Sequence, residues 1–207
     1  WLAPEGQSLV RIAGVPGVVV RGFQMLVGAN QFGVEITGDC PGTRVENLRA
    51  VRFSDSNGTR RGVALAFLYL HDGASGTEAA PIVIHDVEVR NGGIGIQLGN
   101  ESPIAGRYVP IRWVQLENCA VIGRGLDSGY QLILANALEQ VTVTRSTFAF
   151  GACGISWFVK EARLLQNVRI SHNSFHQLKN WMVWNDSIAV QEAVQVEQNL
   201  IARTSGA

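Results

Sequence analysis

The stretch Val168-Arg169-Ile170-Ser171-His172-Asn173-Ser174-Phe175 carries the pattern that decides the fold. Val168 and Ile170 would share one face of a strand, because alternate side chains of a strand point the same way. Asn173 and Phe175 form a second pair of this kind. The three-residue step from Ile170 to Asn173 interrupts the alternation. We therefore expect two short strands that meet at a corner and face one interior.

The same spacing recurs six more times along the chain. The seven copies start at Val18, Thr43, Ile82, Val114, Val141, Val168 and Val194. Valine and isoleucine dominate the first two inward positions, as a buried pleated surface favours. A unit of a few tens of residues that repeats along a whole chain is typical of a stacked, quasi-one-dimensional fold.

A further apolar segment follows most copies, and it usually begins with a glycine. These segments are 33–36, 62–65, 93–98, 129–134, 154–157 and 181–184. The sixth has Asn180 where the others have glycine, and both residue types suit a sharp corner with positive φ. One repeat is therefore predicted to contain about three short strands around a triangular coil.

The pattern resembles the repeats (PbH1-type) of the pectin-lyase-like superfamily, most clearly at 168–175. The resemblance extends from about Val10 to Ile201. It implies an all-β fold: a right-handed, single-stranded parallel β-helix, a solenoid of about seven coils. The chain is also similar to β-helix regions of large bacterial multidomain proteins, some of which are kinase-linked.

Composition indicates one folded domain without a strongly charged partner. The 207 residues are enough for one substantial core. Because 17 basic residues balance 17 acidic ones, we expect no nucleic-acid partner. No apolar run reaches the ~18–20 residues of a membrane span. Cys40, Cys119 and Cys153 match no zinc motif, so we expect free structural thiols and no metal.

The two ends of the sequence suggest a piece of a longer chain. It begins in repeat-like sequence without a signal peptide or initiator methionine, and it stops just after a strand. We therefore expect a single β-helix domain over 1–207, with other domains of the same parent chain as partners. The compartment is not encoded in these residues, and an extracytoplasmic or cell-surface location fits the class best.

Two inward positions carry amides. Asn173 and Asn199 stand at the third inward position of adjacent repeats. An isolated buried amide is costly, so we expect an internal ladder in which the two hydrogen-bond to each other and to corner backbone. Trp157 shares the parity of Ile155 and is predicted to lie in the core.

Outward residues at one position should line up from coil to coil, and they create one dense polar cluster. Its first row is Glu46, His85 and Glu117, and its second is Asn47, Asp86 and Asn118. Paired carboxylates with a histidine could perform acid–base chemistry or hold a cation. The alternative is a solvated face with ordinary ion pairs.

Comparison with enzymes of the superfamily separates fold from activity. Pectate lyases carry a motif that resembles Trp-Ile-Asp-His-Asn, in which the aspartate helps to hold calcium. The matching stretch 169–173 reads Arg-Ile-Ser-His-Asn, with Ser171 at the acidic position. The Asn-Thr-Asp, Asp-Asp and Gly-His-Gly motifs of the β-helix polygalacturonases are absent from the sequence. The resemblance therefore implies a fold and no particular activity.

Insertions and exposed aromatic residues supply the candidates for ligand binding. Insertions at 71–81 and 99–110 should leave the same corner of adjacent coils, where they form one wall or merely decorate the surface. The candidate ligand-binding residues are Arg49, Glu88, Tyr108, Trp113, Arg124 and Asp127.

Two function classes follow. The first is a non-catalytic scaffold or carbohydrate-recognition domain of a larger bacterial protein. The alternative is a polysaccharide lyase or glycoside hydrolase that acts on an acidic polysaccharide, with calcium as cofactor if it is a lyase. Its catalytic candidates are Glu46, His85, Asp86 and Glu117. A third hypothesis is self-assembly through the sheet edges at the ends of the stack.

Overall fold

The computed structural model describes residues 7–28, 31–52, 66–91, 93–100, 106–125, 129–159, 165–184 and 194–203. These ranges form an all-β structure of seventeen strands. No helix occurs in them, and so none that could cross a membrane. The predicted segment 62–65 and the candidate Asp127 lie outside the described residues.

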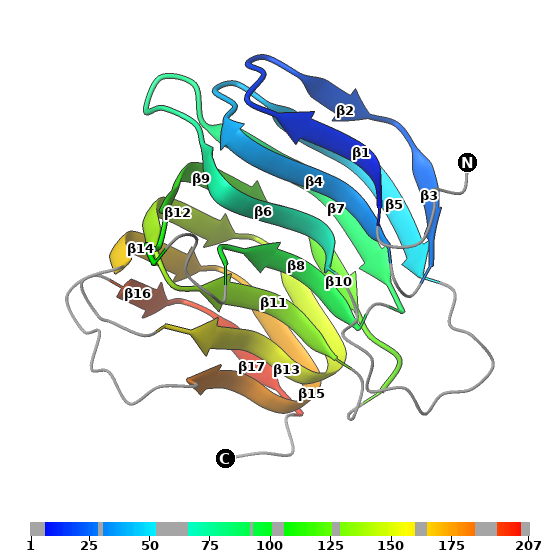
Figure 1. The fold of residues 1–207 in the computed structure, drawn as a ribbon. Helices are drawn as coiled ribbons and strands as arrows, with labels where there is room; N and C mark the ends of the chain where they lie inside the picture. Colours follow the sequence, from blue (N-terminus) through cyan, green and yellow to red (C-terminus); the bar gives the residue numbers. More distant parts are fainter. Residues whose placement is uncertain are drawn as a thin grey trace.

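The strands follow one another with few long connections (Figure 1). They are β1 (Ser8–Ala13), β2 (Val19–Arg21), β3 (Gln24–Val27), β4 (Phe32–Asp39), β5 (Arg44–Arg52), β6 (Ala66–Ser75), β7 (Ile82–Arg90), β8 (Ile94–Leu98), β9 (Ile111–Glu117), β10 (Ala120–Ile122), β11 (Tyr130–Ala135), β12 (Leu138–Thr144), β13 (Thr147–Phe158), β14 (Leu165–Ser171), β15 (Ser174–Trp184), β16 (Val194–Glu197) and β17 (Leu200–Ala202).

All strand pairs are parallel, and nearly all join a strand to its counterpart in the next repeat. Three ladders result. The first ladder contains β2, β5, β7, β9, β12, β14 and β16. The second ladder contains β3, the later halves of β5 and β7, then β10, β13, β15 and β17. The third ladder contains β1, β4, β6, β8, β11 and the ends of β13 and β15.

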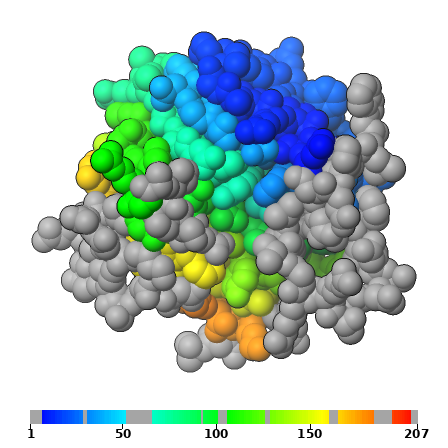
Figure 2. All heavy atoms as spheres, viewed as in Figure 1, coloured from blue at the N-terminus to red at the C-terminus, as the bar shows by residue number. Residues whose placement is uncertain are grey.

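The predicted register of the seven copies is confirmed. Val141 lies opposite Val114 and Val168, and Ile170 lies opposite Val143 and Val196. The repeats therefore stack from the N-terminal end, blue in Figure 1, to the C-terminal end in orange and red. In space-filling view the first repeats form one continuous surface on the face shown (Figure 2).

The corner between the first and second ladders has one backbone conformation in every repeat. Its residues are Gly22, Asn47, Asp86, Asn118, Arg145, His172 and Gln198, all with φ between 50° and 74°. This left-handed conformation costs an ordinary side chain energy and is tolerated best by glycine, asparagine and aspartate. It explains the three-residue step between inward positions in the sequence.

A second row of left-handed residues ends the strands of the second ladder. It consists of Asn91, Phe150, Gln177 and Arg203, with φ between 51° and 60°. Strands β13 and β15 continue through this corner, so that β13 alone is 12 residues long. The expected three separate strands are therefore merged into two in those repeats.

Inward positions form one apolar core. Val143, Ile170 and Trp157 are fully buried, which confirms Trp157 as a core residue. Phe148 and Phe175 stack with ring centroids 5.2 Å apart in neighbouring repeats.

The three cysteines are free, as predicted, and all three are buried. Burial raises the pKa of Cys119 and of Cys153 to about 12. Both groups are therefore neutral thiols at ordinary pH.

A polar ladder runs through this core. The backbone N–H of Ser146 donates to Asn173 Oδ1 at 2.9 Å, and the N–H of Asn173 donates to Asn199 Oδ1 at 2.9 Å. The Asn173 amide also donates to the carbonyl of Val143 at 3.0 Å. In the same way, the backbone N–H of Cys119 donates to the hydroxyl oxygen of Ser146 at 3.0 Å. These bonds confirm the predicted amide ladder and pair backbone groups that the tight corner leaves without a strand partner.

Three details of the predicted pattern are wrong. Phe23 and Ile201, both expected inward, are 56% and 41% exposed. They lie in the first and the last repeat, which each have a neighbouring repeat on one side only. The third-ladder partner of Val34 is Leu68, so the segment in register is 67–70 and not 62–65. Phe67 takes the glycine position there, and its ring fills the space beside Gly33, where a Cβ would collide with it.

Ile170→Asp should unfold the domain or destabilise it by at least about 4 kcal/mol, because it places an unpaired charge in the stacked core. The matched control is Thr142→Asp, an outward position opposite Arg169, which should cost about 1 kcal/mol or less. Urea denaturation followed by circular dichroism measures both. Similar stability of the two variants would show that Ile170 does not face the interior.

Candidate functional site

The four catalytic candidates come together at the corner of β5, β7 and β9. Glu46 lies opposite His85, and His85 lies opposite Glu117. His85 Nδ1 is 3.2 Å from Asp86 Oδ2. The predicted column therefore exists as a spatial arrangement.

Each carboxylate of this column contacts a nearby donor. The pairs are Arg44–Glu46 at 3.0 Å, Arg145–Glu117 and Asn118–Asp86. The side chains of the four candidates are between 19% and 44% exposed. Ion pairs at this exposure contribute at most about 1 kcal/mol each. The contacts are those of a solvated ion-pair network.

The candidate ligand-binding residues are divided among several parts of the repeats. Arg49 and Glu88 are partners on the outer side of the second ladder, with Arg49 Nε 3.8 Å from Glu88 Oε2. Tyr108 precedes β9, and Trp113 lies within β9 with a left-handed φ of 53°. Arg124 is an exposed residue that follows β10. The five of these candidates that the structure describes do not define one site.

A tighter cluster of titratable groups lies on the outer face of the third ladder. Glu35 comes from β4, and His71 and Asp72 come from β6. His71 Nε2 is 2.7 Å from Glu35 Oε1, and His71 Nδ1 is 3.0 Å from Asp72 Oδ1. A neutral imidazole can donate to only one of the two carboxylates, whereas the protonated ring donates to both.

Further donors surround the two carboxylates. Glu35 accepts a hydrogen bond from the hydroxyl of Ser8, and Arg11 Nε lies 3.9 Å from it. Asp72 and Asn100 are joined twice: the N–H of Asp72 donates to Asn100 Oδ1 at 3.0 Å, and the Asn100 amide donates to Asp72 Oδ1 at 2.9 Å. The side chains of Glu35 and His71 are only 12% exposed, and that of Asp72 is 47% exposed.

These contacts determine the ionisation of both carboxyl groups. Burial by itself raises the pKa of Glu35, but hydrogen bonds from Ser8 and His71 outweigh it and bring the pKa below the usual 4.5. Burial likewise raises the pKa of Asp72, and hydrogen bonds from Asn100 and His71 bring it below the usual 3.8. Both groups are carboxylates at neutral pH, one on each side of the imidazole.

Two aromatic rings extend the cluster. Tyr69 stacks on His71 with ring centroids 4.1 Å apart and an interplanar angle of 13°. Phe32 in turn stacks on Tyr69, with ring centroids 5.2 Å apart and an interplanar angle of 17°. Phe32, Tyr69 and His71 are all half-buried. We call Phe32, Glu35, Tyr69, His71 and Asp72 the β4–β6 site.

Sequence reasoning treats His71 and Asp72 as candidates on the insertion 71–81, and one register error kept it from placing them beside Glu35. With 62–65 as the strand, Glu35 would face Ala64. In the structure Glu35 lies opposite Tyr69, and Thr37 lies opposite His71. The alternation of Leu68 and Leu70 with Tyr69 and His71 was the signal that could have found the site.

The predicted insertion at 71–81 is in part strand, because β6 extends to Ser75, and its residues meet those of the insertion at 99–110. Asp72 and Asn100 are hydrogen-bonded, and a Cβ on Gly73 would press against Val109. Their described residues therefore form adjoining parts of one edge beside the β4–β6 site.

A scan against protein-family models finds no match, and searches of curated proteins and of solved structures find none either.

Glu35→Gln should flatten the acid limb of the stability curve. Because the folded-state pKa of Glu35 is lowered, its ionised form contributes stability above about pH 4.5, and this contribution is lost as pH falls through the folded-state pKa. Urea denaturation between pH 7 and pH 3 should show a shallower loss for the variant, with the remainder due to Asp72 and other groups. Glu139→Gln, which removes a carboxylate paired with Arg112, is the control. Identical slopes for wild type and Glu35→Gln would contradict the assignment.

Proposed function

We propose that the chain is a right-handed parallel β-helix of the pectin-lyase-like type, and a domain of a larger bacterial protein that recognises carbohydrate at the β4–β6 site. In-register parallel ladders of seven repeats support the architecture. The function is proposed on one observation: Tyr69 stacks on His71, and the His71 imidazole lies between the carboxylates of Glu35 and Asp72.

The β4–β6 site has both elements that sugars require. An apolar face of a pyranose packs on an aromatic ring, and the half-buried Phe32, at the end of the stack that Tyr69 holds in place, is the candidate surface. Sugar hydroxyls donate to acceptors, and hydrogen bonds to ionised acceptors are stronger than neutral ones. Asp72 is the most exposed of the acceptors here, and its bonds to His71 and Asn100 fix its orientation.

The ionisation of the site favours binding over hydrolysis. A glycoside hydrolase needs one protonated carboxylic acid to protonate the leaving group. Glu35 and Asp72 both have lowered pKa values and are ionised at neutral pH. The site therefore supplies acceptors for hydroxyl groups and lacks a carboxylic acid of raised pKa.

The second candidate is a polysaccharide lyase or glycoside hydrolase acting on an acidic polysaccharide. The adjacency of Glu46, His85 and Glu117 in successive repeats favours it. It predicts that the purified protein with calcium shortens a uronate polymer, and that alanine at these three positions and at Asp86 abolishes the activity. Unshortened polymer in size-exclusion chromatography would rule it out for the polymers tested.

Tyr69→Ala should weaken carbohydrate binding about tenfold, because losing a stacked aromatic ring costs roughly 1–1.5 kcal/mol. Affinity electrophoresis against soluble neutral polysaccharides identifies a bound polymer, and calorimetry then compares the variants. The control is Phe23→Ala, which removes a ring that is 56% exposed at another corner. Binding that is unchanged in Tyr69→Ala, or lost equally in Phe23→Ala, would contradict the proposal.

A further inference from the structure

The two ends of the stack are open sheet edges. At the N-terminal end the outermost strands of the three ladders are β1, β2 and β3 (Figure 1). At the C-terminal end they are β16, β17 and the last part of β15. Within the described residues, each of these edges has a neighbouring repeat on one side only. An open edge presents backbone N–H and C=O groups to which another strand can pair.

Exposed apolar side chains gather at these two ends. Inward residues inside the stack, such as Val143 and Ile170, are fully buried, whereas the inward Phe23 and Ile201 are 56% and 41% exposed. The described chain exposes nine large apolar residues, and six of them lie in or beside the end strands: Val15, Val19, Phe23, Leu26, Leu200 and Ile201. Apolar surface concentrated in this way is typical of a surface that binds another protein.

The two ends fit each other as steps of one stack. Each full repeat supplies a strand, or part of one, to each of the three ladders. The N-terminal end begins with β1, a third-ladder strand that precedes the first strand of the first ladder, β2. The C-terminal end finishes with β16 and β17, and their repeat has no third-ladder strand among the described residues. A second copy placed on this end would supply that strand with its own β1.

The register of the chain predicts which residues would meet. Continuing the observed pairs by one repeat places β2 of a second copy beside β16, and β3 beside β17. Val20 of the second copy then lies opposite Val196, and Met25 lies opposite Ile201. All four side chains are apolar and point inward. The core would therefore continue from one copy into the next.

The backbone at the two ends permits this continuation. Gly22 and Gln198 turn the same left-handed corner, with φ of 74° and 53°, so the first and second ladders can continue together. In the third ladder the same register places Val10 of the second copy opposite Met182. Both residues are half-buried and pack against the core of the single chain.

The outer faces of the two ends carry opposite charges at matching positions. In the continued first ladder, Arg21 of the second copy lies opposite Glu197. Glu197 is 45% exposed and pairs with Arg169 of its own chain at 2.7 Å. Arg21 lies opposite Glu46 of its own chain. Basic and acidic side chains would thus alternate across the joint, in the order Arg169, Glu197, Arg21 and Glu46.

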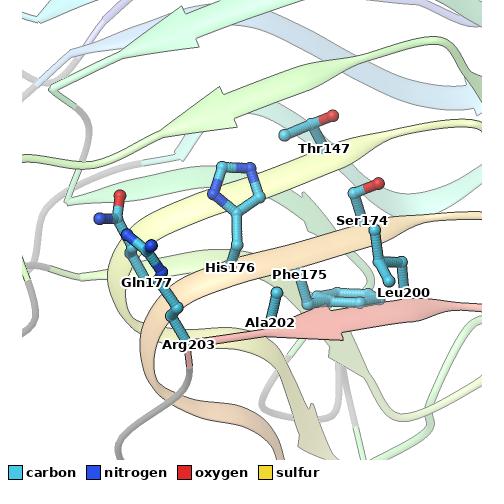
Figure 3. A pocket seen from close by; sticks show the side chains of 8 residues that line it. All are labelled: Thr147, Ser174, Phe175, His176, Gln177, Leu200, Ala202 and Arg203. Carbon is cyan, nitrogen blue, oxygen red and sulfur yellow. The ribbon is translucent and has the colours of Figure 1, made fainter.

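A hollow of about 460 Å³ lies on the outer side of the second ladder at the C-terminal end. Figure 3 shows Leu200 and Ala202 on β17, the last described strand, and Ser174 on the neighbouring β15. In the continued ladder, Leu26 of the second copy lies opposite Ala202, at the edge of this hollow. Leu26 and Leu200 are 56% and 64% exposed in the single chain. The joint would therefore cover apolar side chains outside the core as well.

We propose that a second copy of this chain binds head to tail, so that its β1, β2 and β3 extend the ladders that end in β15, β16 and β17. The joint continues all three ladders, covers Phe23 and Ile201, and pairs Arg21 with Glu197. Because it joins unlike ends, every added copy presents a new open end, and such an interface produces a linear filament. Two C-terminal ends do not fit each other, because both present Glu197 and both lack the third-ladder strand in their described residues.

Single-cysteine variants test which ends meet. Val19 and Gln195 are exposed and occupy matching outward positions of the continued first ladder. Parallel neighbours lie about 4.8 Å apart, within the Cα range of a disulfide. Val19→Cys mixed with Gln195→Cys under mild oxidation should therefore give a disulfide-linked dimer of the two different chains, seen by mass spectrometry.

The control partner is Thr142→Cys, at the same outward position of a repeat inside the stack, and it should not couple to Val19→Cys. Neither Val19→Cys nor Gln195→Cys should dimerise by itself, and the native cysteines are buried. The absence of a dimer in the first mixture, or an equal yield with Thr142→Cys or with Gln195→Cys alone, would overturn the proposal.

Sedimentation velocity from micromolar concentrations upward measures the assembly itself. The wild-type protein should form species that grow with concentration, and a monomer at all concentrations would refute the proposal. Arg21→Glu should weaken association about fivefold, the loss expected for one exposed ion pair. The control is Arg112→Glu, which makes the same change inside the stack, where Arg112 pairs with Glu139. Equal association of the two variants would contradict the predicted joint.

This proposal is independent of carbohydrate binding. Tyr69→Ala should leave both the disulfide and the sedimentation unchanged, because Tyr69 lies on β6, two strands away from β1 in the third ladder. Failure of the assembly proposal is thus distinguishable from failure of the proposed function.

Discussion

The left-handed corner between the first and second ladders is the constraint on which the rest of the structure depends. Because every repeat turns at the same position, from Gly22 to Gln198, inward side chains of successive repeats fall directly over one another. The corner leaves backbone groups without strand partners, and a side chain such as that of Asn173 hydrogen-bonds those of the preceding repeat. Strain of about 1–2 kcal/mol at an unfavourable residue such as Arg145 is accepted because the parallel ladders on both sides over-determine it.

The same register assembles sites from distant parts of the sequence. Glu35 and His71 are 36 residues apart yet lie within hydrogen-bond distance, and Arg49 meets Glu88 from the neighbouring repeat. An outward side chain therefore has neighbours set by the repeat above and the repeat below. The β4–β6 site results from this stacking of neighbouring repeats on the third ladder.

The inward half of this arrangement could be predicted from sequence and the outward half could not. Burial restricts inward positions to apolar or ladder-forming side chains. The alternation around Ile170 was therefore enough to predict which residues of neighbouring repeats lie opposite one another. Glycine was a poorer guide, because the third-ladder position of Gly33, Gly95 and Gly154 is occupied by Phe67, Gln131 and Trp181 in the other repeats. This moved the predicted strand away from Tyr69 and His71. The Glu46–His85–Glu117 column was predicted correctly as an arrangement, since it follows from the first-ladder register. Its chemistry could not be predicted, because partners such as Arg44 and Arg145 depend on side-chain conformations at exposed corners.

The most direct test of the stacking register is a pair of engineered disulfides. Thr142 and Arg169 are partners across β12 and β14, so Thr142→Cys with Arg169→Cys should oxidise to an intrachain disulfide, seen by mass spectrometry after thiol alkylation. Thr142→Cys with Asn167→Cys is displaced by two residues along the strand, which puts the Cα atoms beyond the ~7 Å limit for a disulfide, and it should stay reduced. The three native cysteines are buried and do not compete. A disulfide in the displaced pair, with none in the first, would contradict the register and with it the proposed β4–β6 site.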